Sequence, residues 1–147
     1  MTQEEINLLF TDLCGRIQYG VKCQCFDEKT ITPLTGIKSN TELYFDELDY
    51  KEFDGIVKIT YCKPYLFPLS SMTEEQMKEI TKRYNYYNIY GTYIEITNHI
   101  EGYWDDDNSC NLQDYLWLED WYNKNHFDYR GLIEKGLAID ATDKNIY

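Results

Sequence analysis

The residue types best suited to chemistry gather near one end of the sequence, in NKNHFDYRGLIEKGLA, residues 123 to 138. A histidine, a carboxylate, a phenol and a guanidinium follow one another there, which is a set that could bind an anionic ligand. The candidate ligand-binding residues are therefore His126, Asp128, Tyr129 and Arg130. A structural clasp explains the same residues: the segment would fold back over the preceding helix and cover its tryptophans. The clasp is the simpler interpretation, because exposed ion pairs are common and weak.

The five cysteines, at positions 14, 23, 25, 62 and 110, are the next candidates for chemistry. The first residues, MTQEEINLLFTDL, have acids where a signal peptide has a basic region. We therefore expect reduced thiols in a cytoplasm. Paired Cys-x-x-Cys spacing, the strong zinc signal, is missing, and alternate cysteines on a strand are more often buried apolar residues. We predict no metal and no cofactor, and a thiol or zinc enzyme stays as an alternative.

The acidic stretch DDDNSCN, residues 105 to 111, superficially resembles a calcium loop. A calcium loop of that type needs glycine at its sixth position and glutamate at its twelfth, where this chain has Cys110 and Leu116. No glycine-rich phosphate loop and no recognisable nucleophile motif is found either. The sequence therefore predicts a binding protein and not an enzyme.

Two tryptophans, Trp117 and Trp121, are four residues apart on a predicted helix that ends near residue 125. The helical pattern puts Leu112, Tyr115, Leu118 and Tyr122 on the core side and the tryptophans on another. Tryptophans at this spacing suit a binding hot spot, although burial under the tail of the chain is the more usual outcome. With the preceding loop they give the candidate partner-binding set: Trp104, Asp105, Asp106, Asp107, Trp117 and Trp121.

The charge of the chain limits its partners. A net charge of -12 opposes direct nucleic-acid binding and docking on an anionic membrane, and no apolar run is long enough for a membrane helix. The same charge suits a basic protein partner, or mimicry of nucleic acid towards a protein that binds it. The acidic stretches 42–54 and 101–120 would face that partner, with some of the 15 tyrosines as anchors. The pattern leaves homo-oligomerisation open.

Periodicity predicts the elements that position these residues. Helices are expected over 2–17 and 70–84, with capping boxes at Thr2/Glu5 and Thr73/Gln76, and a third ends near 125. Strands are expected over 21–26, 41–48, 55–62 and 86–96, the third ended by Lys63-Pro64, with a loop or irregular hairpin over 27–41. A turn and a short strand or extended tail follow residue 126. The prediction is a single domain, 1–147, of α+β class with a small, mostly antiparallel sheet and about three helices.

Three segments, VKCQC, KPYLFPLSSMTEEQ and WYNKNHFDYRGLIEKGLA, resemble a family of short proteins from gut Bacteroidetes and the phages that infect them. Two positions depart from the family pattern: Phe67 stands where arginine is usual, and Asn125-His126 replaces a doubled histidine. The resemblance implies a phage or mobile-element setting, hence a host cytoplasm and a host protein as target, in a counter-defence role. It implies no particular activity. A module that binds a nucleotide or another small ligand is the first alternative.

Overall fold

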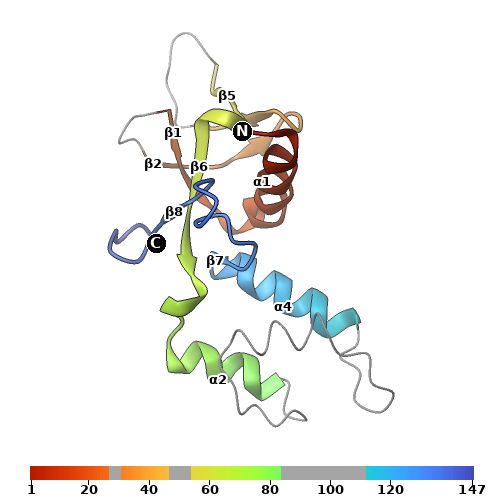
Figure 1. Cartoon of the computed structure of the whole chain (residues 1–147), viewed down its shortest axis with the longest axis vertical. Coiled ribbons are helices and arrows are strands. Elements are labelled where there is room, and N and C mark those ends of the chain that lie inside the picture. The colour runs from red at the N-terminus through yellow and green to blue at the C-terminus, as the bar shows by residue number, and fades with distance from the viewer. Residues whose placement is uncertain (27–30, 47–53, 84–111) are drawn as a thin grey trace.

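The computed structural model describes residues 1–26, 31–46, 54–83 and 112–147 of the chain (Figure 1). Its helices are α1 (Gln3–Arg16), α2 (Glu74–Arg83) and α4 (Leu112–Lys124), joined by the 3-10 turns η1 (Ile17–Tyr19), η2 (Ile59–Tyr61) and η3 (Leu69–Ser71). Its strands are β1 (Lys22–Cys25), β2 (Ile31–Pro33), β3 (Gly36–Ile37), β4 (Glu42–Tyr44), β5 (Ile56–Lys58), β6 (Cys62–Pro68), β7 (Phe127–Asp128) and β8 (Ile139–Asp140). The α+β class predicted from the sequence is confirmed. The strand predicted over 86–96 and the acidic loop 101–111 lie outside the described residues.

Both predicted capping boxes are present. At the start of α1, the Glu5 N–H donates to Thr2 Oγ1 at 3.2 Å and the Thr2 N–H donates to Glu5 Oε2 at 2.6 Å. Ahead of α2, Gln76 and Thr73 exchange the same two bonds at 3.2 and 2.9 Å. Each box satisfies two N–H groups that the first turn of a helix leaves without partners. Local side-chain chemistry therefore fixes where these two helices begin.

Strand β6 is the centre of the larger sheet and runs through the middle of the molecule (Figure 1). On one side it pairs antiparallel with β1, which pairs in turn with β2 at the edge of the sheet. It also pairs in parallel with β8, on the edge opposite β1, and, further along, with β7. The terminal segment of the chain therefore completes a sheet that the first strand begins.

The prediction that Pro64 ends a strand is wrong, because β6 passes through it. The Phe26 N–H donates to the Tyr61 carbonyl at 2.7 Å, and alternation along the antiparallel ladder makes Cys23 and Pro64 a non-hydrogen-bonded pair. A residue in such a pair directs its N–H away from the partner strand, so β1 loses no hydrogen bond to proline. On the opposite edge of β6, pairing with β8 begins only at Tyr65.

The smaller sheet has the order β3-β4-β5, with both pairs antiparallel. Leu43 and Val57 point from it into the core, while Tyr44 points outward and is 41% exposed. The range 27–41, predicted as a loop or irregular hairpin, supplies β2 to the larger sheet and β3 to this one. The threonine and glycine content of this range gave no strand signal. The strands β2 and β3 form because they pair with β1 and β4, and not because of their own composition.

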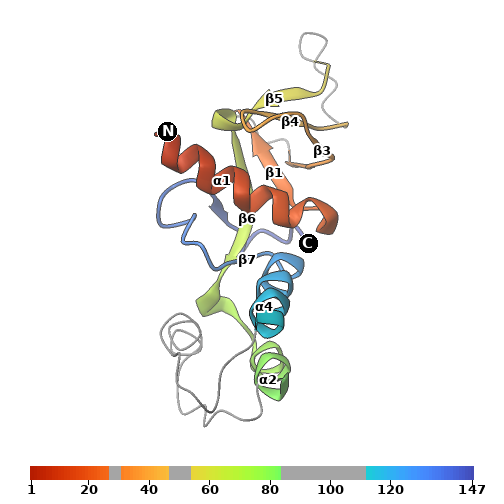
Figure 2. The ribbon, with the colours of Figure 1, turned by 90° about the vertical axis from the view of Figure 1, so that its right-hand side faces the viewer.

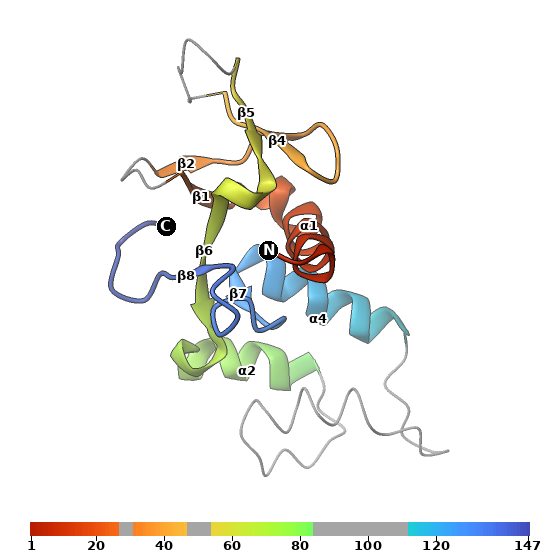
Figure 3. The ribbon, with the colours of Figure 1, turned by 45° about the horizontal axis from the view of Figure 1, so that its top comes forward.

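Three clusters of apolar side chains make up the core. The largest lies between α1, the strands β1 and β6, and the inner face of the smaller sheet, and it includes Leu132 and Leu137 from the terminal segment. Helix α1 lies across the face of the larger sheet, and α2 and α4 lie at the end of the molecule opposite the smaller sheet (Figures 2 and 3). A second cluster joins α2, α4 and β7, and a third joins Tyr65 to Ala141 and Ile146. In the described ranges no helix has the length and apolar character needed to cross a membrane.

Candidate functional site

The segment 126–131 lies where α1, α4 and β6 meet. Helix α4 ends with the Asn125 side chain donating to the Trp121 carbonyl at 2.9 Å, and His126 then takes a left-handed conformation with φ of 58°. The Phe67 N–H donates to the His126 carbonyl at 2.9 Å, which joins the turn to β6. The sharp reversal after α4 therefore directs the next residues back along the sheet.

A buried ion pair on α1 anchors this segment. Arg16 donates to both carboxylate oxygens of Asp12, at 2.6 and 2.9 Å, and both side chains are fully buried. The same guanidinium donates to the Phe127 carbonyl at 2.7 Å and to the Tyr122 carbonyl at 3.4 Å. Such a pair is stable in a core only when further hydrogen bonds satisfy it, and these two carbonyls do so. The charge pair therefore fastens α1 to the end of α4.

Sequence reasoning missed this pair. Asp12 and Arg16 have the i, i+4 spacing of a helical ion pair, which was a usable signal. They lie beside the buried residues Leu9 and Leu13 on α1, so their burial follows from what covers that face of α1 and not from α1 itself. The covering segments, which contain Tyr122 and Phe127, are more than a hundred residues away in the chain.

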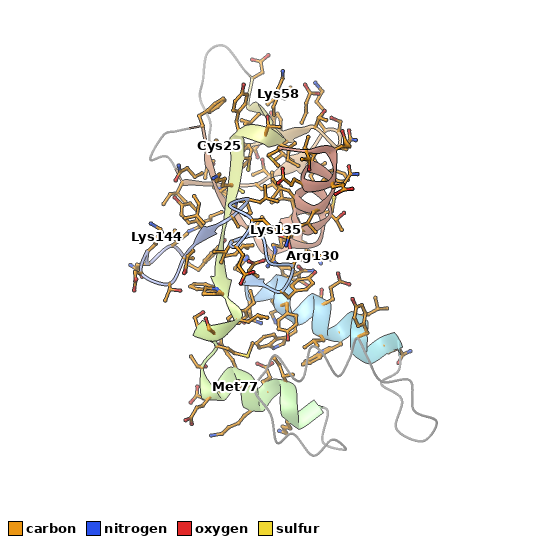
Figure 4. All side chains as sticks on the ribbon, viewed as in Figure 1. Cys25, Lys58, Met77, Arg130, Lys135 and Lys144 are labelled. Carbon is orange, nitrogen blue, oxygen red and sulfur yellow. The ribbon has the colours of Figure 1, made fainter. Side chains whose placement is uncertain are left out.

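Arg130, labelled in Figure 4, lies beside the ion pair of Asp12 and Arg16, and Tyr129 lies next to Arg130. The Tyr129 hydroxyl donates to Glu119 Oε1 at 2.9 Å, and Arg130 forms an ion pair with the same oxygen. Arg130 Nε lies 3.5 Å from Asp12 Oδ1, and the guanidinium carbon lies 4.7 Å from the centre of the Tyr129 ring. Two carboxylates and two guanidiniums thus neutralise one another. Burial is the largest cause of the raised pKa of Tyr129, so its hydroxyl stays a proton donor at neutral pH.

Asp128 is occupied by the backbone of its own turn. Its Oδ1 accepts from the Leu132 N–H at 2.8 Å and its Oδ2 accepts from the Ile133 N–H at 2.7 Å. The side chain is buried, and Gly131 supplies the left-handed residue that the turn requires, with φ of 69°. Both oxygens of a candidate ligand-binding carboxylate therefore hold the turn together.

His126 is buried against the last residue of the chain. Its ring stacks on the Tyr147 ring with 4.0 Å between centroids, and its Nδ1 has no hydrogen-bond partner within the described structure. Desolvation, followed by the positive charges of Arg16 and Lys22, lowers the pKa of His126 to about 4. The imidazole is therefore neutral at pH 7 and does not act as a cationic anchor for an anion.

The tryptophans of α4 turn towards the core. Trp121 is 5% exposed and stacks on Phe127 with 5.7 Å between ring centroids, and Trp117 is half-buried in the same cluster. The predicted core stripe was wrong at Tyr115, which is 45% exposed. The inward face is shifted because β7 packs beside Trp121 and draws that side of the helix inward. Four of the candidate partner-binding residues lie outside the described residues: Trp104, Asp105, Asp106 and Asp107. The two positions that depart from the family pattern lie next to each other, because the Phe67 N–H donates to the His126 carbonyl.

The remaining chemical candidates are the buried cysteines. Cys23, Cys25 and Cys62 are free thiols buried in the largest cluster, on the facing strands β1 and β6. Over the described ranges no group of three or more cysteine, histidine or acidic side chains has a geometry that could hold a metal ion.

Comparisons with known proteins give no relative to transfer a function from. No family model, no curated protein and no solved structure matches the chain. The chemistry of the site therefore rests on its own geometry. Within the described structure, the polar groups of residues 126–130 contact one another, α1, Glu119 and the terminal segment.

Proposed function

We propose that this chain is an acidic binding protein that recognises the basic surface of a protein partner, with the outer face of the smaller sheet as part of the contact. The observation that carries the proposal is the environment of Tyr44. Tyr44 is 41% exposed at the centre of the sheet, beside two glycines: a Cβ on Gly36 would lie 3.1 Å from Tyr44 Cβ, and one on Gly55 would lie 3.5 Å from Tyr44 Cε2. No side chain on these two neighbours shields the ring.

Charge beside this ring sets the kind of partner. Asp46 and Asp54 are both exposed where β4 ends and before β5 begins. The segment from 42 to 54 carries six acids against one lysine in the sequence, within a chain of net charge -12. A tyrosine inside a strongly negative surface suits a partner rich in lysine and arginine, because the ring adds apolar contact and cation–π attraction to the electrostatic attraction.

Two competing hypotheses have less support. A nucleotide module would need Arg130 and His126 as anchors, but Arg130 is paired with Glu119 and His126 is neutral at pH 7. A thiol or zinc enzyme would need reactive thiolates, but contact between the thiols and burial raise the pKa values of Cys25 and Cys62. The phage resemblance favours a host protein as the partner, including one whose basic surface normally binds nucleic acid.

A capture experiment with native mass spectrometry tests the proposal. The tagged chain is incubated with lysate from a gut Bacteroidetes host, washed at increasing salt, and every bound mass is read. We expect a stoichiometric basic protein that is released as salt rises and is lost when Tyr44→Ala is combined with Asp46→Asn and Asp54→Asn. The matched control, Glu74→Gln with Glu75→Gln, changes two exposed residues of α2, removes as much charge and keeps the partner. A bound nucleotide or metal instead of a protein sinks the proposal.

A further inference from the structure

The three buried cysteines meet across one ladder of the larger sheet. Cys23 and Cys25 share the inward face of β1, and Cys62 opens β6 directly opposite Cys25. The Cys62 thiol lies near the thiols of both Cys23 and Cys25, and none of the three is more than 1% exposed. The arrangement therefore gives Cys62 two neighbours with which it could form a covalent bond.

The hydrogen-bond pattern shows which of these two neighbours is close enough to Cys62 for a disulfide. The bond from the Phe26 N–H to the Tyr61 carbonyl makes Cys25 and Cys62 a non-hydrogen-bonded pair. The Cα atoms of such a pair are about 4.5 Å apart, inside the range of roughly 4.4–6.8 Å that a disulfide spans. Cys23 stands opposite Pro64 and is only diagonal to Cys62, and diagonal positions are about 7–8 Å apart, beyond that range.

We propose that Cys25 and Cys62 are a redox pair that closes to a cross-strand disulfide when the protein meets a small peroxide. The thiolate of one cysteine attacks a peroxide oxygen, the O–O bond breaks, and hydroxide leaves and takes up a proton as water. The resulting sulfenic acid is attacked by the second sulfur, the S–O bond breaks and a second water leaves. Two thiols lose two electrons and two protons, and one hydrogen peroxide is reduced to two waters.

The surroundings of the pair make this oxidation slow and selective. Contact with Cys62 and burial raise the pKa of the Cys25 thiol, so little thiolate exists at neutral pH. The reduced pair is therefore stable at rest, and oxidation speeds up as pH rises. Hydrogen peroxide is small enough to act at a site that larger disulfide reagents reach only after the strands separate.

The disulfide would join the two ends of the segment that contains the smaller sheet. Residues 26–61, between the two cysteines, contain β2, β3, β4 and β5, and hence the outer face of the smaller sheet on which Tyr44 is exposed. Cross-linking the ends of a segment of this length removes conformational freedom from the unfolded chain and raises the unfolding temperature by roughly 5–15 °C. Oxidation would thus stabilise the smaller sheet without requiring β1 and β6 to change their pairing.

The test uses the full chain with Cys14→Ser and Cys110→Ser, so that only the three buried thiols remain. The folded protein is treated with hydrogen peroxide at pH 7 and pH 9, and its mass, its tryptic map and its unfolding temperature are measured. We expect the mass to fall by two hydrogens and the tryptic map to show a 25–62 cross-link that dithiothreitol reverses. The cross-link should form faster at pH 9 than at pH 7, and the oxidised protein should unfold at a higher temperature. Cys25 is labelled in Figure 4.

Substitution of each cysteine separates the outcomes. Cys23→Ser keeps the cross-link and Cys25→Ser abolishes it, with circular dichroism confirming that both variants fold. A 23–62 cross-link, oxygen addition without a cross-link, or a lower unfolding temperature after oxidation would overturn the proposal. If a serine variant does not fold, fragmentation of the cross-linked tryptic peptide, in which Cys23 and Cys25 lie together, decides between the two pairings.

Discussion

Asp12 and Arg16 lie one turn apart on α1, are both completely buried, and are joined by two hydrogen bonds of 2.6 and 2.9 Å. Neither residue touches solvent, yet the pair decides how α1 meets α4, because Arg16 also holds the Phe127 and Tyr122 carbonyls. The polar side chains that first suggested a reactive site are therefore gathered around a structural charge pair.

Removing one partner of this pair should be costly. Arg16→Met leaves the Asp12 carboxylate buried with only Arg130 nearby, so we expect a loss of about 3–5 kcal/mol in the free energy of unfolding. The double variant Asp12→Leu/Arg16→Met removes both charges and should lose less than the two single variants combined. Urea denaturation of the four proteins measures this coupling, and strictly additive losses would contradict it.

Asp128 should behave as a turn clamp. Asp128→Ala removes acceptors from two backbone N–H groups, at Leu132 and Ile133, and we expect a loss of about 2–4 kcal/mol. Asp128→Asn keeps one acceptor oxygen and should lose roughly half of that. Hydrogen exchange at the Leu132 and Ile133 amides should rise in the same order. Unchanged exchange at both amides in Asp128→Ala would refute the clamp.

His126 should make stability depend on pH. Its pKa is lowered from 6.5 to about 4 in the folded protein, so the unfolded chain binds the extra proton between these values. Stability is therefore lost as pH falls from 6.5 towards 4, by about 3 kcal/mol at most. His126→Phe keeps an aromatic ring against Tyr147 but cannot be protonated. The variant should therefore lose less stability than the unchanged protein between pH 6.5 and 4, by the same difference of about 3 kcal/mol. Parallel pH curves for the two proteins would show that His126 is not responsible.

Gly15 should be required by the contact between α1 and α4. A Cβ there would lie 2.6 Å from Asn123 Nδ2 and 3.2 Å from Asn123 Cγ, and Asn123 is itself buried. Gly15→Ala should therefore destabilise the protein by about 1–3 kcal/mol, even though alanine favours helix. In an Asn123→Ala background the same change should be neutral or stabilising. Thermal unfolding of the four combinations tests this, and an equal loss in both backgrounds would exclude the clash.

Features of the fold that depend on neighbouring residues were predicted correctly, and features that depend on residues distant in the chain were not. Thr2/Glu5 and Thr73/Gln76 fixed two helix starts because a capping box involves only neighbouring residues. Pro64 misled because its effect depends on which strand edge it faces, and that is decided by β1 and β8. The residues 126–130 were recognised as a set, but their roles depended on Asp12, Arg16 and Glu119, which periodicity cannot bring together.

The position of β6 has a consequence for how the chain is made. A ribosome completes β6 and its partner β1 well before β7 and β8, which also pair with β6. Until they emerge, the central strand of the sheet is an open edge that another chain could pair with. The Arg16 guanidinium also waits for the Phe127 carbonyl. A nascent chain stalled before residue 127 would therefore expose the strand on which the core is built.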